Sequence, residues 1–118
     1  MRITFVCPPI NRSGGMRVAA IYARGLVARG HQVHTVFAAP DRPSWKRRIR
    51  AARKGQPALS PKPRDHYFTD LSFTELEHPG PVTDADVPPA DVVIASFWRT
   101  APWVAELSPD KGGKAYYM

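Results

Sequence analysis

The sequence predicts an α/β fold, a Rossmann-like open parallel sheet with helices on both faces. The stretch from Arg2 to Phe37 reads as strand, glycine turn, helix and strand. Two apolar runs, Ile3 to Cys7 and Val92 to Ile94, suit strands that are covered on both faces. The 118 residues, 43% of them apolar, are enough for one core. We therefore expect one domain over residues 1–118.

The N-terminal half predicts a central strand, a helix and a second strand. Ile3 to Cys7 is the central strand, and Ser13 is the expected N-cap of the helix. Gly30 is the expected residue that ends this helix in a left-handed conformation, and Val33 to Ala38 form the second strand. An apolar face of the helix is predicted from residues that recur at helical spacing: Val18, Ile21, Tyr22, Gly25 and Leu26.

The remainder predicts an irregular insert followed by four ordered segments. Basic residues and prolines fill the insert, at about residues 40–65, where Trp45, Ile49 and Ala52 are spaced to line one side of a short helix. His66 to His78 predicts one or two weak strands near the sheet edge. After the strand at Val92, we expect a helix from Thr100 to Leu107 and the start of another strand at Lys114 to Met118.

The composition of the chain indicates the charge of its partner and the cellular compartment in which it works. The net charge of +7, from 17 basic and 10 acidic residues, predicts an anionic partner. Cys7 is the only cysteine, so an intrachain disulfide is excluded and a reducing, cytoplasmic setting is expected. No apolar run reaches the length of a signal-peptide core or a membrane span.

The first candidate site is the turn Ser13-Gly14-Gly15. Glycines after a strand let backbone amides approach a ligand, and the following helix favours an anion by about 0.3–1 kcal/mol. Phosphate is the natural ligand. The alternative, which this pattern leaves open, is that the two glycines only make a tight turn.

The second candidate site is the segment from Ser96 to Thr100. It follows the strand that begins at Val92, so it should lie at the same carboxyl edge of the sheet as the glycine turn. Trp98 can stack on a sugar or a base, and Arg99 can bond a phosphate. Alternatively, Phe97 and Trp98 cap the core while Arg99 is solvated.

The third candidate is the basic insert. Six of its residues suit contact with an anionic membrane, in which apolar side chains enter the interface and cations meet headgroups: Trp45, Lys46, Arg47, Ile49, Arg50 and Arg53. A solvated charged loop is the alternative. The segment matches no nucleic-acid-binding module, so no nucleic-acid partner is expected.

The sequence lacks the motifs of several common nucleotide-binding, metal-binding and nucleophilic sites. The dinucleotide pattern G-x-G-x-x-G and the P-loop ending Gly-Lys-Ser/Thr are absent. The histidines lack metal-ligand spacing, and neither a serine nor Cys7 has an identifiable base beside it in the sequence. We therefore expect no metal or cofactor, and we assign no catalytic residue.

Two stretches of the chain resemble the bacterial family 4 (group 1) glycosyltransferases. The first is the opening strand, the Gly-Gly turn, a helix that ends in Arg29-Gly30-His31, and a second strand. The other is Ala90-Asp91 before an apolar strand, then the Trp98-x-Thr100-Ala101 turn and a Lys111-Gly-x-Lys114 connection. Together the two stretches cover a little over half of the chain.

The resemblance implies the N-terminal, acceptor-side domain of a retaining GT-B enzyme, truncated before its donor-binding domain. Such an enzyme transfers a sugar from a nucleotide-activated donor to an acceptor, here a glycan or a lipid-linked substrate. A peripheral position at the inner face of the membrane is expected from the composition of the basic insert alone. The resemblance places Gly14 and Gly15 at the donor diphosphate. It implies an acceptor-side cleft formed by Ser13, Arg17, Ser96, Trp98, Arg99 and Thr100.

The chain also departs from the family pattern. The Glu-x7-Glu donor motif has no counterpart, because the residues eight positions after Glu75, Glu77 and Glu106 are Thr83, Ala85 and Lys114. The fragment is therefore expected to be inactive by itself. The competing hypothesis is a non-enzymatic module of the same fold that binds phosphorylated ligands or anionic surfaces.

Overall fold

The computed structural model describes residues 1–10, 14–40, 45–55 and 67–117, and it contains a five-stranded sheet. All neighbouring strands are parallel and the order is β3-β2-β1-β4-β5. This arrangement confirms the predicted Rossmann-like fold. The strands are β1 (Arg2–Cys7), β2 (Gln32–Phe37), β3 (Phe73–Glu75), β4 (Val92–Ala95) and β5 (Lys114–Tyr117).

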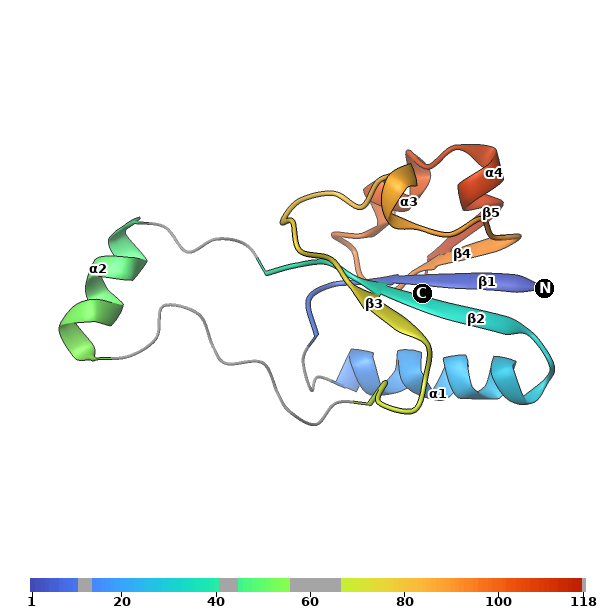
Figure 1. Cartoon of the computed structure of the whole chain (residues 1–118), viewed down its shortest axis with the longest axis horizontal. Coiled ribbons are helices and arrows are strands. Elements are labelled where there is room, and N and C mark those ends of the chain that lie inside the picture. Colours follow the sequence, from blue (N-terminus) through green and yellow to red (C-terminus); the bar gives the residue numbers. More distant parts are fainter. Residues whose placement is uncertain (11–13, 41–44, 56–66, 118) are drawn as a thin grey trace.

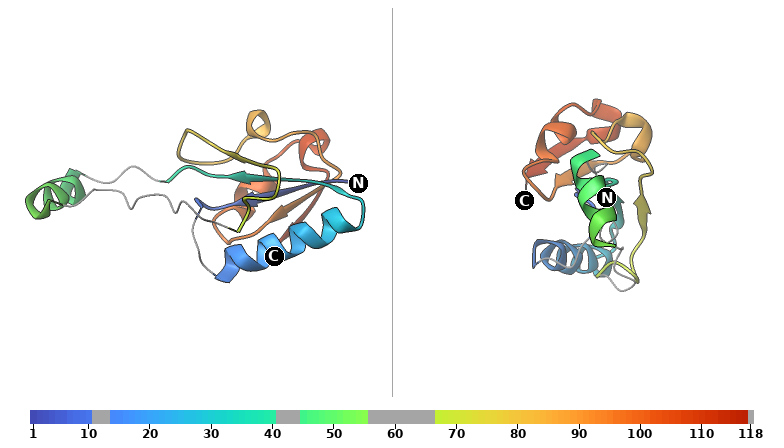
Figure 2. Two further views of the ribbon diagram at one scale, coloured as in Figure 1. Left: turned by 60° about the horizontal axis from the view of Figure 1, so that its bottom comes forward. Right: turned by 90° about the vertical axis from the view of Figure 1, so that its left-hand side faces the viewer.

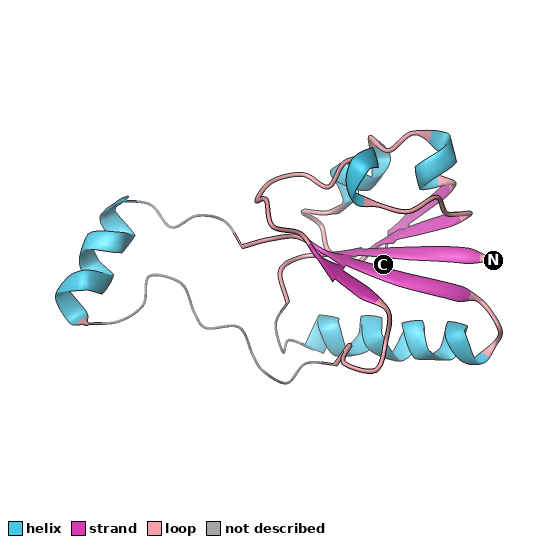
Figure 3. Ribbon diagram, in the orientation of Figure 1, coloured by secondary structure: helices cyan, strands magenta, loops and turns pink. Residues whose placement is uncertain are grey.

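Helices cover both faces of the sheet (Figure 1). Helix α1 (Gly14–Ala28) lies on one face, and the short helices α3 (Ala101–Ala105) and α4 (Pro109–Gly112) lie on the other (Figure 3). A 3-10 turn, η1 (Asp84–Asp86), precedes β4. Alternate residues of β1 supply the two cores: Phe5 packs on the α1 side and Val6 on the α3 side.

Helix α1 buries a different face from the one that the sequence predicts. Val18, Ile21 and Tyr22 are 43%, 55% and 59% exposed. The buried residues are smaller and follow the same helical spacing: Met16, Ala19, Ala20 and Ala23. The alanines let α1 approach a sheet whose own side chains, such as Phe5 and Phe37, fill the space. The predicted apolar face was therefore wrong at Val18, Ile21 and Tyr22, whereas Leu26 does pack against the core. The helix itself is confirmed.

Most other predicted elements are present. Gly30 has a φ of 90° after the end of α1, β3 is the predicted edge strand, and β5 is the predicted last strand. The helix expected over residues 100–107 is shorter, and α4 was not predicted. The Ser13 cap and residues 41–44 and 56–65 of the insert lie outside the described residues.

Helix α2 (Trp45–Lys54) is the predicted basic helix of the insert. It stands away from the sheet in Figure 1 and in the left view of Figure 2. Because α2 follows β2 along the chain, it projects on the side where the parallel strands end. Within the described part of the chain, no helix is long and apolar enough to cross a membrane.

Candidate functional site at the carboxyl edge of the sheet

The strand order places a topological switch point between β1 and β4. From β1 the chain continues through α1 to β2 on one side, while β4 lies on the other side of β1. Val6 is in register with Ala95, and the amide of Ser96 donates to the carbonyl of Val6 at 3.1 Å. The loops that follow β1 and β4 therefore leave from neighbouring strands at one edge. Ligands of open α/β sheets bind at such a point.

The β1 side of this edge ends in the first turn of α1. Gly14 and Gly15 are exposed at its start, and Arg17 is exposed in the same turn. The first amides of a helix have no acceptor inside the helix, and this turn carries no acidic residue to offset its partial positive charge. The turn therefore favours an anion.

Glycine at position 14 is not required by the backbone. Gly14 lies outside the left-handed region, and a Cβ added there would have no heavy atom within 4 Å. Another small residue would fit the turn equally well. A requirement for glycine in a tight turn therefore does not account for Gly14.

On the β4 side, Ser96 and Thr100 hold the loop in place. The Ser96 hydroxyl donates to the carbonyl of Val6 at 3.3 Å and to the Cys7 sulfur at 3.1 Å. Thr100 is fully buried, and its hydroxyl donates to the carbonyl of Phe97 at 2.8 Å. Thr100, which was predicted to belong to the acceptor-side cleft, is thus buried and closes the turn from inside.

Cys7 provides no nucleophile at this edge. Its side chain is fully buried at the end of β1. Burial raises the pKa of the Cys7 thiol to about 12, against the smaller opposing effect of the hydrogen bond from Ser96. The thiol therefore stays protonated and unreactive near neutral pH.

Trp98 and Arg99 are the exposed members of the β4 loop. Trp98 is 66% exposed, so it does not cap the core, and its ring centroid lies 5.7 Å from that of Phe97. Arg99 is exposed beside it. An aromatic face for stacking and a guanidinium for an anion thus follow β4 directly, next to the strand that leads to Gly14.

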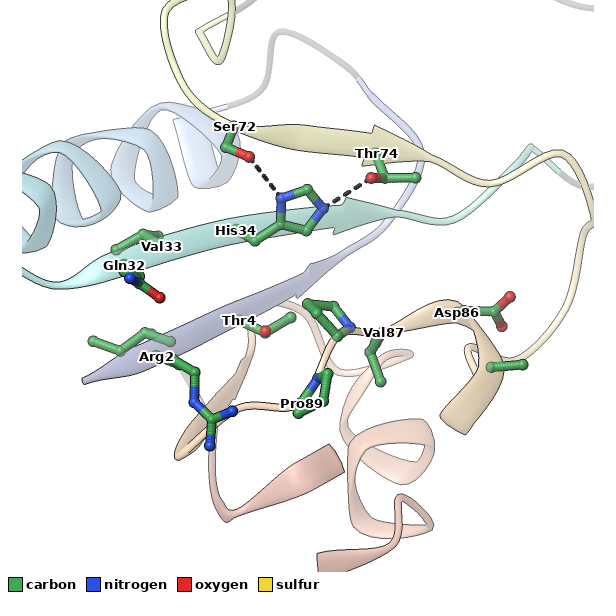
Figure 4. Close-up of a pocket in the computed structure, with 13 residues that line it drawn as sticks. Arg2, Thr4, Gln32, Val33, His34, Ser72, Thr74, Asp86, Val87 and Pro89 are labelled. Carbon is green, nitrogen blue, oxygen red and sulfur yellow. Dashed lines mark hydrogen bonds between the residues drawn. The ribbon is translucent and has the colours of Figure 1, made fainter. Parts of the chain in front are cut away.

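A large hollow lies elsewhere, on the sheet face opposite α1 (Figure 4). It encloses about 650 Å³ and is lined by polar residues of β1, β2 and the β3 region, including Arg2, Thr4 and Gln32. His34 lies in it between two hydroxyl groups, with Ser72 at 2.8 Å from Nδ1 and Thr74 at 2.8 Å from Nε2. Burial lowers the pKa of His34.

These contacts argue for a structural role of His34. A neutral imidazole donates through one ring nitrogen and accepts through the other, and both are engaged within the protein. His34 therefore ties β2 to the β3 region and offers no free base. The sequence carries a signal for this position: Gln32 and His34 alternate with the apolar Val33, which indicates that one sheet face is left uncovered there.

A second hollow of about 650 Å³ separates the segment before β4 from α3, with Thr83 and Trp103 in its lining. Neither large hollow contains the residues predicted to bind a ligand. We favour the carboxyl edge over both, because topology and charge converge on it, whereas His34 in the first hollow is bonded to its neighbours and Trp103 in the second packs against the core.

Comparison of the chain with protein-family models, with curated proteins and with solved structures finds no match. The resemblance to glycosyltransferases therefore stays a prediction that rests on the residues quoted above. Among the described residues, no three histidine, cysteine, aspartate or glutamate side chains gather as metal ligands.

Proposed function

We propose that this chain is the N-terminal portion of a retaining, GT-B type glycosyltransferase, which transfers a sugar from a nucleotide-activated donor to an acceptor. One observation carries the proposal: Gly14 and Gly15 begin the helix that follows β1, Trp98 and Arg99 follow β4, and these two neighbouring strands form a switch point. This pairing offers an anion site beside a stacking surface. The sugar-transfer chemistry itself comes from the family resemblance.

The chemical role of this edge would be electrostatic. When the sugar leaves its donor, negative charge develops on the diphosphate, and the first amides of α1 would stabilise that charge. Arg99 and Trp98 would orient the acceptor on the opposite side of the site. A retaining transferase can use the donor phosphate as its base, so the proposal assigns no carboxylate.

The isolated chain should show no sugar-transfer activity. Stabilising the leaving diphosphate requires groups from both sides of a closed cleft, and the family's Glu-x7-Glu motif is not among these residues. Incubation with nucleotide sugars and membrane glycans should therefore give no product. Sugar transfer by this chain alone would contradict the two-sided mechanism.

The gene provides the sharpest test of the proposal. Reading the nucleotide sequence past the codon for Met118 should show an open frame that encodes a second α/β domain with a Glu-x7-Glu motif. A second domain without that motif, or of another fold, would overturn the assignment.

A second candidate function is a non-enzymatic module that binds phosphorylated ligands. The exposed basic helix α2 favours it, because its charge needs no second domain to attract an anion. Nucleoside diphosphate sugars separate the two candidates: the glycosyltransferase should bind them in preference to inorganic phosphate, and the module should not.

A further inference from the structure

Helix α2 combines dense positive charge with exposed apolar side chains. Its ten residues include six lysines and arginines and no acidic residue. Trp45 is 67% exposed and Ile49 is 47% exposed, four positions apart on one side of the helix. Lys46, Arg50 and Lys54 share another side at the same spacing. The helix is therefore amphipathic, yet its apolar side is not buried.

Nothing within α2 offsets its charge. Like charges four residues apart destabilise a helix, and Lys46, Arg50 and Lys54 form two such pairs. The helix also stands away from the sheet (Figure 2), so the body of the protein does not cover Trp45 or Ile49. A partner with negative charge would reduce the repulsion between the basic residues, and an apolar layer in that partner would remove Trp45 and Ile49 from water.

We propose that α2 binds the surface of an anionic lipid bilayer. Trp45 and Ile49 enter the interfacial region, and the lysines and arginines contact the headgroups. The Lys46 ammonium lies 5.7 Å from the centre of the Trp45 ring, so charge and aromatic surface sit at the same end of the helix. Nucleic acid would supply the phosphates but no apolar layer for Ile49, so lipid is the better fit.

Binding by α2 would orient the protein. The helix follows β2 and therefore projects on the side of the sheet where the strands end. The edge with Gly14 and Trp98 would then face the bilayer, where a lipid-linked molecule is within reach. The binding itself does not depend on the proposed transferase activity.

Flotation of the full chain with vesicles tests the proposal. One set of vesicles contains phosphatidylcholine alone, and the other adds phosphatidylglycerol. The chain should float only with the anionic set, and added salt should release it because exposed charges are screened. Failure to float with anionic vesicles at low salt, or equal binding to both sets, would overturn the proposal.

Paired variants separate charge from insertion. R50Q with R53Q should weaken binding about 25-fold, since each basic residue near the surface contributes about fivefold. W45A with I49A should weaken it at least about tenfold, because the apolar contacts are lost. The matched control is I21A with R29Q, an exposed apolar and an exposed basic residue outside α2, and it should bind as the unmodified chain does.

All these residues are exposed, so circular dichroism should give the same melting curve for each variant. Unchanged vesicle binding by either α2 variant would contradict the assignment. A single-stranded RNA bound more tightly than the anionic vesicles, and equally well by W45A with I49A, would identify α2 as a nucleic-acid contact instead.

Discussion

The carboxyl edge between β1 and β4 and helix α2 are both exposed and both favour anions, but they are built differently. At the edge, hydrogen bonds from Ser96 and Thr100 fix the loop that carries Trp98. In α2, ten consecutive residues supply both the positive charge and the apolar side chains, and no contact with the sheet is needed. If both bind anions as proposed, the edge would recognise one ligand geometry, whereas α2 would recognise only an anionic surface with an apolar layer.

This difference predicts opposite responses to the same perturbation. Anything that loosens the sheet should disturb the edge, because its groups come from two strands. The same change should leave α2 able to bind vesicles, because an interfacial helix is stabilised by the surface that it occupies.

The largest effect is expected from Phe37→Ala. Phe37 is 1% exposed and packs edge-to-face on Phe68, with ring centroids 4.9 Å apart. The cavity should cost about 4 kcal/mol, a large part of the stability of a small domain. Ligand binding at the edge should be lost, and vesicle flotation should persist. Loss of both together would show that α2 depends on the sheet.

Alanine substitutions at two glycines should give the next largest difference in stability. Gly113 has a φ of 49°, and an added Cβ would lie 2.1 Å from the carbonyl oxygen of Asp91, so Gly113→Ala should cost about 3 kcal/mol. Gly14→Ala should leave stability unchanged or raise it by up to about 1 kcal/mol. Urea unfolding measures both. A marked loss of stability in Gly14→Ala would restore the tight-turn interpretation.

Trp98→Ala should affect the edge without affecting the fold. Its side chain is 66% exposed, so the unfolding midpoint should not change. If it orients the acceptor by stacking on a sugar, its removal should weaken acceptor binding about tenfold. Isothermal titration calorimetry measures the affinity. Equal affinity of the variant would remove Trp98 from the site, and flotation with vesicles should be the same in either case.

The smallest expected effect is a dependence of the stability of the sheet domain on pH, whereas vesicle binding by α2 should not depend on pH. Burial lowers the pKa of His34, so its unfolded form binds protons more readily and stability falls as pH drops through about 6.5. His78 acts oppositely: its hydrogen bond to Asp86 raises its pKa, so its contribution is present below about pH 6.5 and is lost at higher pH.

Single variants resolve these two contributions. Unfolding can be measured between about pH 7.5 and 5.5, a range that spans the ordinary histidine pKa of about 6.5. As the pH falls through this range, His34→Gln should reduce the loss of stability. His78→Asn should increase that loss. The reverse pattern would contradict the assigned shifts. Vesicle binding should stay constant, because lysine and arginine remain charged throughout this range.

The sheet could be predicted because its signals are local. Ile3 to Cys7 and Val92 to Ile94 are apolar runs bounded by turn residues, and Gly30 marks a helix end. The expectation that the loops after β1 and β4 leave from one edge of the sheet followed from one rule about parallel strands, and the pairing of β1 with β4 agrees with it. The helix at Trp45 followed from spacing alone.

The side chains that face inward could not be predicted in the same way. Val18, Ile21 and Tyr22 are more apolar than the alanines of α1, yet the alanines are buried because the aromatic side chains of the sheet already fill the space. Likewise, the burial of Thr100 and the position of His34 depend on neighbours from other elements, Phe97 and Ser72 with Thr74. Such pairings arise from tertiary packing.

The most direct test of the central claim is where a nucleoside diphosphate binds. In ¹H–¹⁵N spectra of the full chain, addition of the diphosphate should shift the amides of Gly14 and Gly15 and the indole of Trp98, and Gly14→Ala should weaken these shifts. Shifts confined to the basic residues of α2 would contradict the account, because they would make the anion binding of this protein a matter of charge alone.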